Sequence, residues 1–435
     1  MTRLSGGEGT QLPAEMPRIL LFATTTGYQV RAFDAAASAL GIDLQLVTDR
    51  CDRLDDPWND RALAVRFHEP GSAIEHVVAW AQEHRVDGVL AVGDRPTVLA
   101  ADIASRLGLV WHTPEAAAAS RHKLRTRESL RDAGLPVPAF GCGADTTALE
   151  RWRPWLPVVV KPVVLSGSRG VIRANTPEEL QAAVERVQRL LAAPDVRAMR
   201  DDESNTILVE QFIPGREYAV EGLLEHGRLR VLAVFDKPDP LDGPFFEETI
   251  YVTPSRSDTP TERAIASAVQ AAAGALGLRH GPVHAECRVN GAGVYVLEVA
   301  ARPIGGRCAQ ALTFIHQDGQ TASLESLLLR HALGESMARW QRAPQASAVM
   351  MIPIPGSGVL RRVDGVDDAR AIAGVRDVQI TAKLDQQIVP LPEGATYLGF
   401  IFADADTPAA AEASLRAAHR CLRVRLDPLI ATLRN

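Results

Sequence analysis

The sequence predicts a β-hairpin in the stretch Pro282-Val-His-Ala-Glu286-Cys-Arg-Val-Asn-Gly-Ala-Gly-Val-Tyr-Val-Leu-Glu298-Val-Ala-Ala-Arg302. Residues 282–289 and 294–301 are rich in Val and Leu, and the Asn-Gly-Ala-Gly between them is a turn signal. On such a hairpin Glu286 and Glu298 can face each other across the two strands. Arg302 follows where the second strand opens into a loop.

Both glutamates of this hairpin interrupt apolar runs, and carboxylates are seldom buried without a partner. A hard cation such as Mg²⁺ prefers carboxylate and phosphate oxygens as ligands. The fork of the Arg302 guanidinium could hold an oxyanion nearby. Acidic and basic side chains on exposed strands are also common without a metal. The hairpin alone therefore leaves a charged, solvated strand pair and a metal–phosphate site equally open.

The composition describes a soluble globular protein of two to four domains, with 435 residues, 46% hydrophobic and 23% charged. A net charge of −6 argues against nucleic-acid binding, which needs a basic surface. No apolar run is long enough to span a membrane. The polar segment Met1 to Glu15 lacks a signal-peptide core, so we expect a flexible leader and a cytoplasmic protein. Five scattered cysteines indicate neither a disulfide framework nor structural zinc.

The first part of the chain, residues 17–120, alternates predicted strands and helices. An apolar strand from Arg18, a polar turn at Thr24–Gly27 and an amphipathic helix predict a βαβ unit in an open parallel sheet. Asp94 follows the apolar run that ends at Val92, at the kind of strand end where such sheets bind ligands. The Thr24–Gly27 turn could bind an anion at a helix N-terminus, but the motif is weak and a plain βα turn explains it better.

The middle of the chain carries two further patterns that suit a nucleotide. An apolar strand ends at Lys161 and is followed by the Gly/Ser loop Ser166–Gly170, whose backbone N–H groups could cover phosphates while the lysine holds them. A flexible surface hairpin would have the same loop composition. Further on, a strand through Glu210 leads to Pro214-Gly215. Glu210 could accept the adenine amino group, and Glu217 could hold the ribose hydroxyls.

In this order the motifs resemble the ATP-grasp superfamily, and within it the carboxylate–amine ligases related to the bacterial L-amino acid (dipeptide) ligases. The resemblance implies a multidomain protein of the α/β and α+β classes with an ATP-grasp fold, an N-terminal open parallel α/β domain and a C-terminal lid subdomain. The implied divisions are a leader at 1–16, the N-terminal domain at 17–120, the ATP-grasp domain at 121–345 with a small part at about 140–210 and a large part at about 211–345, and the C-terminal subdomain at 346–435.

The resemblance also assigns roles to individual residues. Arg302 would steady the acyl phosphate and the tetrahedral intermediate, and Glu286 and Glu298 would be the metal ligands. Glu248 would be the substrate-side acid, with Glu247 as the alternative. The implied nucleotide contacts are Lys123, Lys161, Ser166, Gly167, Ser168, Gly170, Glu210, Gln211, Ile213 and Glu217. The implied substrate contacts are Glu248, Tyr251, His284, Arg302, Gly305, Gly306 and Arg307.

Two departures from the family pattern concern the substrate. Relatives often carry histidine where Tyr251 stands and a bulkier residue where Gly306 stands. The second departure indicates a roomier pocket, with Arg307 near enough to meet a carboxylate. The identity of the substrates stays open at this point.

The implied reaction uses ATP and Mg²⁺, with Mn²⁺ as an alternative ion. It activates a small-molecule carboxylate as an acyl phosphate and joins it to an amine, with amino acids as the expected substrates and ADP and phosphate as by-products. Neither nucleic acid nor membrane is an expected partner, and a homodimer is a family expectation.

Two other functions compete with the ligase. One is an ATP-grasp carboxylase or formate-dependent transferase of purine nucleotide biosynthesis, whose phosphate pocket could come from Thr24–Gly27 and Arg95; the long C-terminal region favours the ligase. The other is a non-catalytic nucleotide-binding protein, which the intact Glu286, Glu298 and Arg302 argue against.

Overall fold

The computed structural model describes residues 16–24, 29–49, 62–143 and 149–429. The expected leader, apart from Met16, lies outside these residues, as do Cys51 and most of the Thr24–Gly27 turn. The four cysteines in the described ranges are free thiols, as the spacing predicted. Among the described helices, none combines the length and apolar character needed to cross a bilayer.

The N-terminal domain is the predicted parallel sheet, with the strand order β3-β2-β1-β4. Residues Ile19 to Ala23 of the central strand β1 are apolar and fully buried, as expected for a parallel sheet covered by helices. Its strands are β1 (Arg18–Ala23), β2 (Asp43–Thr48), β3 (Ala62–Ala64) and β4 (Gly88–Val92), and its helices are α1 (Val30–Leu40), α2 (Pro70–Glu83) and α3 (Thr97–Leu107). Two short helices, α4 (Pro114–Arg121) and α5 (Lys123–Asp132), then lead into the rest of the chain.

A small antiparallel sheet follows, with the strand order β5-β8-β6-β7. Helix α7 (Pro177–Leu191) covers it. This helix starts where the Thr176 side chain accepts the N–H of Glu179, and it buries the stripe that includes Leu180, Val184 and Val187. The strands are β5 (Phe140–Cys142), β6 (Val158–Pro162), β7 (Ile172–Ala174) and β8 (Ile207–Gln211); α8 (Pro194–Arg197), η1 (Arg153–Trp155) and η2 (Asp202–Asn205) connect them.

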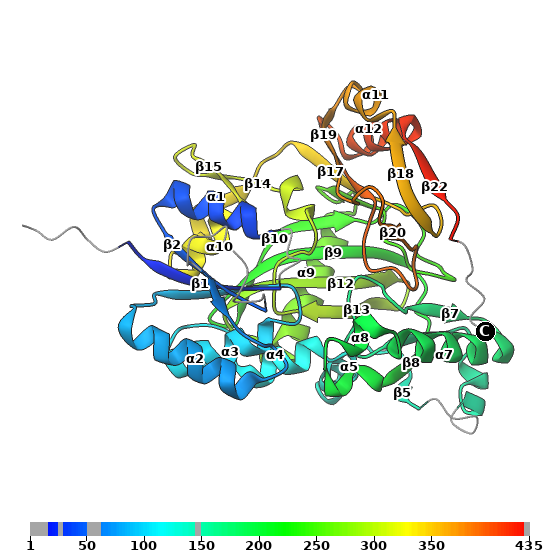
Figure 1. The fold of residues 1–435 in the computed structure, drawn as a ribbon, viewed down its shortest axis with the longest axis horizontal. Coiled ribbons are helices and arrows are strands. Elements are labelled where there is room, and N and C mark those ends of the chain that lie inside the picture. Colours follow the sequence, from blue (N-terminus) through cyan, green and yellow to red (C-terminus); the bar gives the residue numbers. More distant parts are fainter. Residues whose placement is uncertain (1–15, 25–28, 50–61, 144–148, 430–435) are drawn as a thin grey trace, which may run out of the picture.

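One eight-stranded sheet, ordered β13-β12-β9-β10-β11-β17-β21-β19, forms the centre of the molecule (Figure 1). This sheet contains strands from both sides of the expected domain boundary between residues 345 and 346. The position of that boundary stays a prediction. Helix α9 (Thr259–Ala275) packs on β13 and β10, and α12 (Pro408–Cys421) packs on β17 and β21. The strands are β9 (Arg216–Glu225), β10 (Arg228–Asp236), β11 (Ile250–Thr253), β12 (Gly281–Asn290), β13 (Gly293–Ala300), β17 (Ala346–Ile352), β19 (Val375–Ile380) and β21 (Gly399–Ala405).

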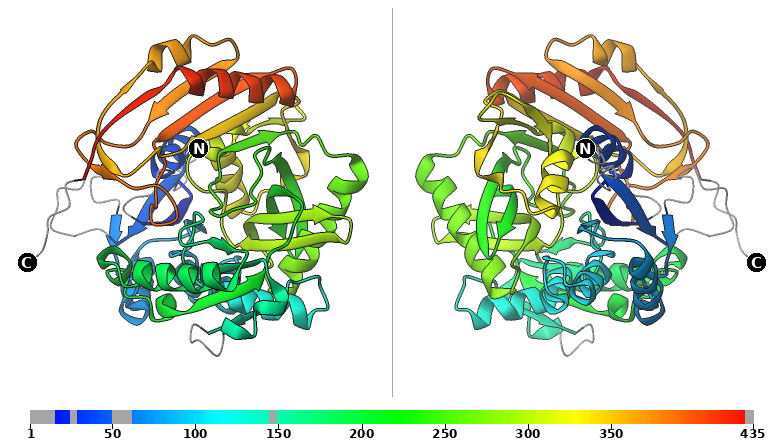
Figure 2. Two further views of the ribbon diagram at one scale, coloured as in Figure 1. Left: turned by 90° about the vertical axis from the view of Figure 1, so that its right-hand side faces the viewer. Right: turned by 90° about the vertical axis from the view of Figure 1, so that its left-hand side faces the viewer.

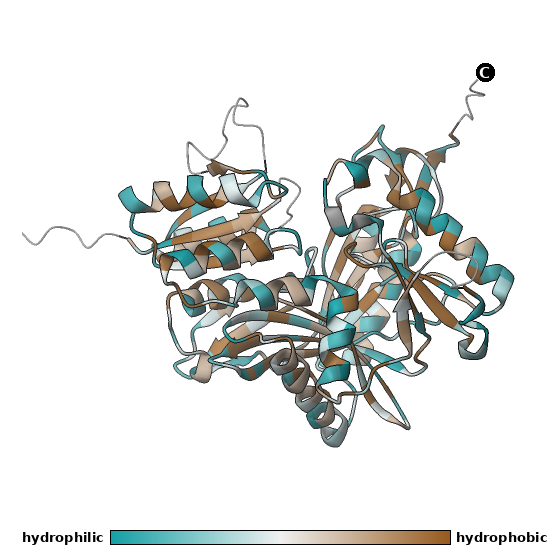
Figure 3. Cartoon of the chain, turned by 90° about the horizontal axis from the view of Figure 1, so that it is seen from below, coloured by the Kyte–Doolittle hydropathy of each residue, from teal (hydrophilic) through white to brown (hydrophobic). Residues whose placement is uncertain are grey.

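Two small sheets complete the fold. One has the order β15-β14-β16 and the other β20-β18-β22. Figure 2 shows helices α11 and α12 at one end of the molecule, in orange and red, opposite the cyan and green helices. In Figure 3 the helices alternate between teal and brown residues, as expected for amphipathic helices that cover sheets. The remaining elements are β14 (Thr313–His316), β15 (Thr321–Ser323), β16 (Trp340–Arg342), β18 (Gly358–Asp364), β20 (Gln387–Ile388), β22 (Arg423–Asp427), η3 (Cys308–Ala311), η4 (Met337–Arg339), α10 (Leu324–Ala332) and α11 (Val366–Arg370).

The predicted hairpin is confirmed as β12 and β13. Its register places Glu286 directly opposite Glu298, and a bulge follows between Glu286 and Cys287. Directly opposed residues in an antiparallel pair project from the same face of the sheet. The two carboxylates therefore share a face, as the sequence pattern suggested.

The buried histidines His280 and His331 stack on each other, and we expect His331 to make the folded protein less stable at acidic pH. His331 is 1% exposed and its ring stacks on His280 at 4.3 Å; burial, with a smaller contribution from His280, lowers its pKa from 6.5 to about 4. As the pH falls below 6.5, His331 therefore becomes protonated in the unfolded chain, whereas in the folded protein it stays neutral until the pH approaches 4. We expect the free energy of unfolding to drop by about 2 kcal/mol between pH 7.5 and pH 5 from His331 alone.

Urea unfolding at the two pH values measures this effect. His331→Phe should lessen the difference, whereas His76→Gln, at an exposed position on α2, should leave it unchanged. Equal pH dependence in the wild type and His331→Phe would contradict the assignment.

Candidate functional site

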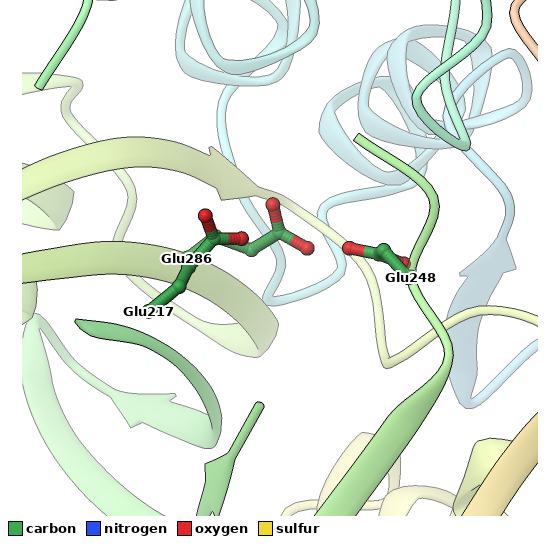
Figure 4. Close-up of side chains that lie close together, drawn as sticks. All are labelled: Glu217, Glu248 and Glu286. Atoms are coloured by element: carbon green, nitrogen blue, oxygen red, sulfur yellow. The ribbon is translucent and has the colours of Figure 1, made fainter. Parts of the chain in front are cut away.

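Three partly buried carboxylates converge beside the central sheet. Glu217 lies on β9, Glu286 on the neighbouring β12, and Glu248 just before β11. One oxygen atom of each lies within 4.8 Å of the others, and Figure 4 shows the three side chains directed toward one another. We call these residues the carboxylate cluster. Only oxygen ligands are offered there, as a hard divalent cation requires.

The ammonium of Lys237 lies among the three carboxylates. Its Nζ is 2.9 Å from Glu217 Oε1, 2.7 Å from Glu248 Oε1 and 2.9 Å from Glu286 Oε1, and its side chain is 2% exposed. Glu217 has a second cationic partner in Arg288, whose Nε lies 2.8 Å from Glu217 Oε2. Lys237 was not predicted from the sequence, although it follows directly after β10, much as Lys161 lies next to the last residue of β6.

Burial and mutual repulsion set the protonation of the cluster. Burial, followed by the charge of Glu286, raises the pKa of Glu248 to about 7. Burial opposes ionisation of Glu286 as well, but Lys237 and His284 outweigh it and hold the pKa of Glu286 well below its ordinary value. Burial lowers the pKa of Lys237, but the three carboxylates overcome this and raise it well above 10.5. Near neutral pH the Lys237 ammonium and the Glu286 carboxylate therefore stay charged, whereas Glu248 is close to the midpoint of its titration.

His284 and Tyr251 border the cluster. His284 Nδ1 lies 3.2 Å from the Glu221 carboxylate and its Nε2 lies 3.8 Å from Glu286. Burial lowers the pKa of His284, but the bonds to the two glutamates prevail and raise it to about 9. Tyr251 donates its hydroxyl to Glu286 over 3.4 Å. Glu221, fully buried on β9, also accepts the N–H of Ile304 and was not found from the sequence.

A narrow recess brings together predicted residues from separate segments. Lys123 at the start of α5, Ser166 of the Gly/Ser loop and Glu298 of β13 line it together with Asp94. The ammonium of Lys123 donates to the Leu165 carbonyl. Glu298 is not part of the carboxylate cluster, but it lies opposite Glu286 on the adjacent strand. The recess thus joins the loop to the hairpin.

Arg302 is held by an aspartate of the N-terminal domain. Its Nε is 2.6 Å from Asp94 Oδ1 and its Nη2 is 3.1 Å from Asp94 Oδ2, whereas Glu298 lies 3.7 Å away. Burial raises the pKa of Asp94, but Arg302 outweighs burial and lowers it, so both groups are charged. A bidentate pair fixes the plane of the guanidinium. The predicted oxyanion-binding arginine is therefore oriented by a residue 208 positions away in the chain.

The lysine and glutamate predicted to bind the nucleotide form a buried ion-pair network. Lys161 contacts the Glu210 carboxylate, which also accepts Arg127 Nε at 2.8 Å and Nη2 at 3.2 Å. Burial raises the pKa of Glu210, but the two cations prevail and lower it to about 2; burial lowers the pKa of Lys161 to about 8. Arg127 was not found from the sequence. Lys161 and Arg127 both bind the Glu210 carboxylate in the structure. The contact of Glu210 with adenine stays a prediction.

Other predicted residues are also engaged by neighbours. Glu217 accepts Arg288 Nε at 2.8 Å, and the Ile213 carbonyl accepts Arg288 Nη1 at 2.8 Å. Gln211 ends β8 and donates its backbone N–H to the Ala139 carbonyl. The roles of Glu217, Gln211 and Ile213 toward ribose and adenine stay predictions.

The Gly/Ser loop adopts left-handed backbone conformations. Gly167, Ser168 and Gly170 have φ of 64°, 54° and 75°. A side chain at Gly170 would place its Cβ 2.9 Å from Pro162 and Leu190, so glycine is required there. The loop is thus a defined turn next to Lys161.

The predicted substrate contacts Gly305, Gly306 and Arg307 follow the β12–β13 hairpin and lie beside the C-terminal strands β19 and β21. Gly306 has a φ of 61°, and a Cβ there would approach the Phe400 ring to 3.4 Å. The guanidinium of Arg307 donates to Gln379 on β19. Gly305 precedes them with open space at its Cα. Glu248 points into the carboxylate cluster, whereas Glu247 is not among the three acids.

If the protein were a carboxylase or transferase of purine biosynthesis, Arg95 would be expected to line a phosphate pocket. In the structure Arg95 donates to Asp49 at 3.1 Å and to the Met199 carbonyl at 2.9 Å. Most of the Thr24–Gly27 turn lies outside the described residues.

Comparison with known families and proteins agrees with the architecture. The ATP-grasp N-terminal domain family matches residues 33–109, the ATP-grasp domain family 155–311, and the L-amino acid ligase C-terminal domain 2 family 350–427. The crystal structure of an L-amino acid ligase from Bacillus licheniformis superposes with a TM-score of 0.79 and 28% identity, covering 95% of this chain and 99% of that one.

Two curated relatives are similar over part of their length. A D-alanine–D-alanine ligase of Aromatoleum aromaticum is 33% identical over 193 residues, which are 43% of this chain and 58% of that ligase. Dapdiamide A synthase of Enterobacter agglomerans is 26% identical over 239 residues, 54% of each chain. The fold and the family expected from the sequence are confirmed: the chain belongs to the ATP-grasp superfamily and is an ATP-dependent ligase similar to the L-amino acid ligases.

Proposed function

We propose that the protein joins two amino acids, or an amino acid and a related amine, through an acyl phosphate formed with ATP and Mg²⁺. The γ-phosphoryl group of ATP passes to a carboxylate oxygen of the first substrate, which yields the acyl phosphate and ADP. The amine nitrogen of the second substrate then attacks the carbonyl carbon. The C–O bond to phosphate breaks, and the amine loses a proton as the amide forms.

The observation that carries this proposal is the arrangement around Glu286. This residue belongs to the carboxylate cluster and also lies opposite Glu298 of the recess. The cluster offers carboxylate oxygens, and Glu286 stays ionised beside Lys237, which suits a hard divalent cation. We assign Glu286 and Glu298 as the ligands of that cation. Bound there, Mg²⁺ would supply charge neutralisation to the phosphates.

The chain's own residues supply positioning and charge. Lys161 and Lys123 flank the Gly/Ser loop and can hold phosphate oxygens. Arg302 binds Asp94 and lies 3.7 Å from Glu298, two residues that line the recess, and it can stabilise the oxyanion that develops on the attacked carbonyl. We assign Glu248 to the amine side, where it can receive the departing proton. Tyr251, His284, Gly305, Gly306 and Arg307 are the proposed substrate contacts.

The C-terminal family match favours the ligase over the purine-type alternative. Incubation of the protein with ATP, Mg²⁺ and pairs of amino acids, with phosphate release and product mass as readouts, tests the proposal. Phosphate release that needs both a carboxylate and an amine is the expected result. Phosphate release that needs bicarbonate or formate and a ribonucleotide would support the alternative, and no release with any substrate would overturn both.

A further inference from the structure

The Gly/Ser loop contacts a turn of the C-terminal subdomain, residues Val389–Thr396, which we call the C-terminal turn. The Gly170 N–H donates to the Pro392 carbonyl at 2.9 Å, and Arg169 Nε donates to the Glu393 carbonyl at 2.9 Å. Figure 1 shows the chain near β20 reaching toward α7 and α8. Two adjacent carbonyls of the turn therefore bind two adjacent residues of the loop.

A side-chain pair reinforces this contact. Arg186 on α7 donates Nε to Glu393 Oε1 at 2.5 Å and Nη2 to Oε2 at 2.9 Å. The bond from Arg186 lowers the pKa of Glu393, so the carboxylate stays ionised near neutral pH. Both side chains are 39% exposed, and a pair this exposed adds little to global stability. Its bidentate geometry nevertheless fixes the turn against α7.

Both partners of the contact have a fixed shape of their own. In the C-terminal turn the Gly394 N–H donates to the Pro390 carbonyl at 2.9 Å, and a Cβ at Gly394 would lie 1.9 Å from the Val389 oxygen. In the loop, Gly170 is packed against Pro162 and Leu190. Each partner therefore presents its bonding groups in a defined geometry.

Open space lies beside the contact between the C-terminal turn and the Gly/Ser loop. A cavity of about 480 Å³ separates part of α7 from the turn and is lined by Arg169, Arg189, Asp195 and Thr396 among others. The polar bonds at Gly170, Arg169 and Arg186 therefore lie at the edge of this open space.

We propose that Glu393 is a positioning residue for ATP, which acts from the C-terminal subdomain by holding the Gly/Ser loop over the phosphates. This inference rests on the proposed function, since it takes the loop to cover ATP. It gives the C-terminal subdomain a role at the nucleotide site: the turn sets where the loop N–H groups lie, without touching either substrate.

The test is Glu393→Gln, which removes the charge and keeps the shape. We expect the KM for ATP to rise roughly three- to tenfold, because misplaced positioning groups weaken productive binding, while the KM values for the two amino acids stay unchanged. Hydrogen exchange of peptides covering Ser166–Ile172 should become faster in the ligand-free variant. The exchanged pair Arg186→Glu with Glu393→Arg should restore much of the ATP affinity and slow the exchange again.

A matched control is Glu335→Gln, which removes the acid from an Arg–Glu pair that Arg330 forms next to α10. It should leave the KM for ATP and the loop exchange unchanged. A wild-type KM for ATP in Glu393→Gln, in an enzyme whose wild type makes amide, would overturn the positioning role alone. Failure of the wild type to make amide with any pair of substrates would instead overturn the proposed function.

Discussion

Replacement of Arg302 by methionine is expected to lower kcat by about 10²–10³-fold, the usual cost of removing one preorganised group that stabilises developing charge. Arg302 is 8% exposed and bound by both oxygens of Asp94, so its guanidinium is already oriented in the structure. Because the role proposed for Arg302 is in the transition state, the KM for ATP should change little. Amine-dependent amide formation under saturating substrates measures the effect.

Two further variants sharpen this result. Asp94→Asn keeps the shape of the orienting group but removes its charge, so it should lower kcat by a smaller factor than Arg302→Met and leave the KM for ATP unchanged. Arg361→Met, at an exposed arginine of β18 paired with Asp385 and Asp427, should match the wild type. Wild-type kcat in Arg302→Met would remove Arg302 from the mechanism.

Glu286→Gln is expected to weaken binding of the divalent cation by about 10²-fold or more and to lower turnover at ordinary Mg²⁺ concentrations. Glu286 is the residue that the carboxylate cluster and the hairpin pair have in common. Loss of its charge leaves Lys237 paired with Glu217 and Glu248, so the fold should persist. Calorimetric titration of the ATP-free protein with Mg²⁺ or Mn²⁺ reads cation binding directly, apart from catalysis.

Glu247→Gln serves as the comparison, because Glu247 neighbours the cluster in sequence but is not among its three acids. It should bind the cation as the wild type does. Glu298→Ala is expected to lower turnover by about 10²–10³-fold, as for other preorganised electrostatic groups. Turnover by Glu298→Ala near the wild-type rate would contradict the assignment of Glu298.

Local patterns predicted the parts of the site whose signals lie within a few residues of one another. The β12–β13 hairpin and its opposed glutamates follow from two apolar runs around a turn. Lys161 and the loop after it follow from the end of a buried strand and its glycines. Such signals depend on backbone preferences and on alternation, which a short stretch of sequence contains.

The partners of these residues could not be predicted in the same way. Asp94 orients Arg302 across 208 positions, and Glu393 binds Arg186 across 207. Both contacts depend on how separate sheets pack, and no short pattern contains that information. Lys237 differs, because its place after an apolar strand was visible in the sequence. Its pairing with Glu217, Glu248 and Glu286 was not visible, since these three acids come from three separate strands or the segments before them.

The fate of a carboxylate oxygen tests the account most directly. An amino acid labelled with ¹⁸O in its carboxylate is supplied as the acyl donor with ATP, Mg²⁺ and an amine that supports amide formation. An acyl phosphate requires that one labelled oxygen leaves with phosphate, so the account predicts one ¹⁸O atom in each phosphate released and one phosphate for each amide. Unlabelled phosphate alongside amide formation would contradict it.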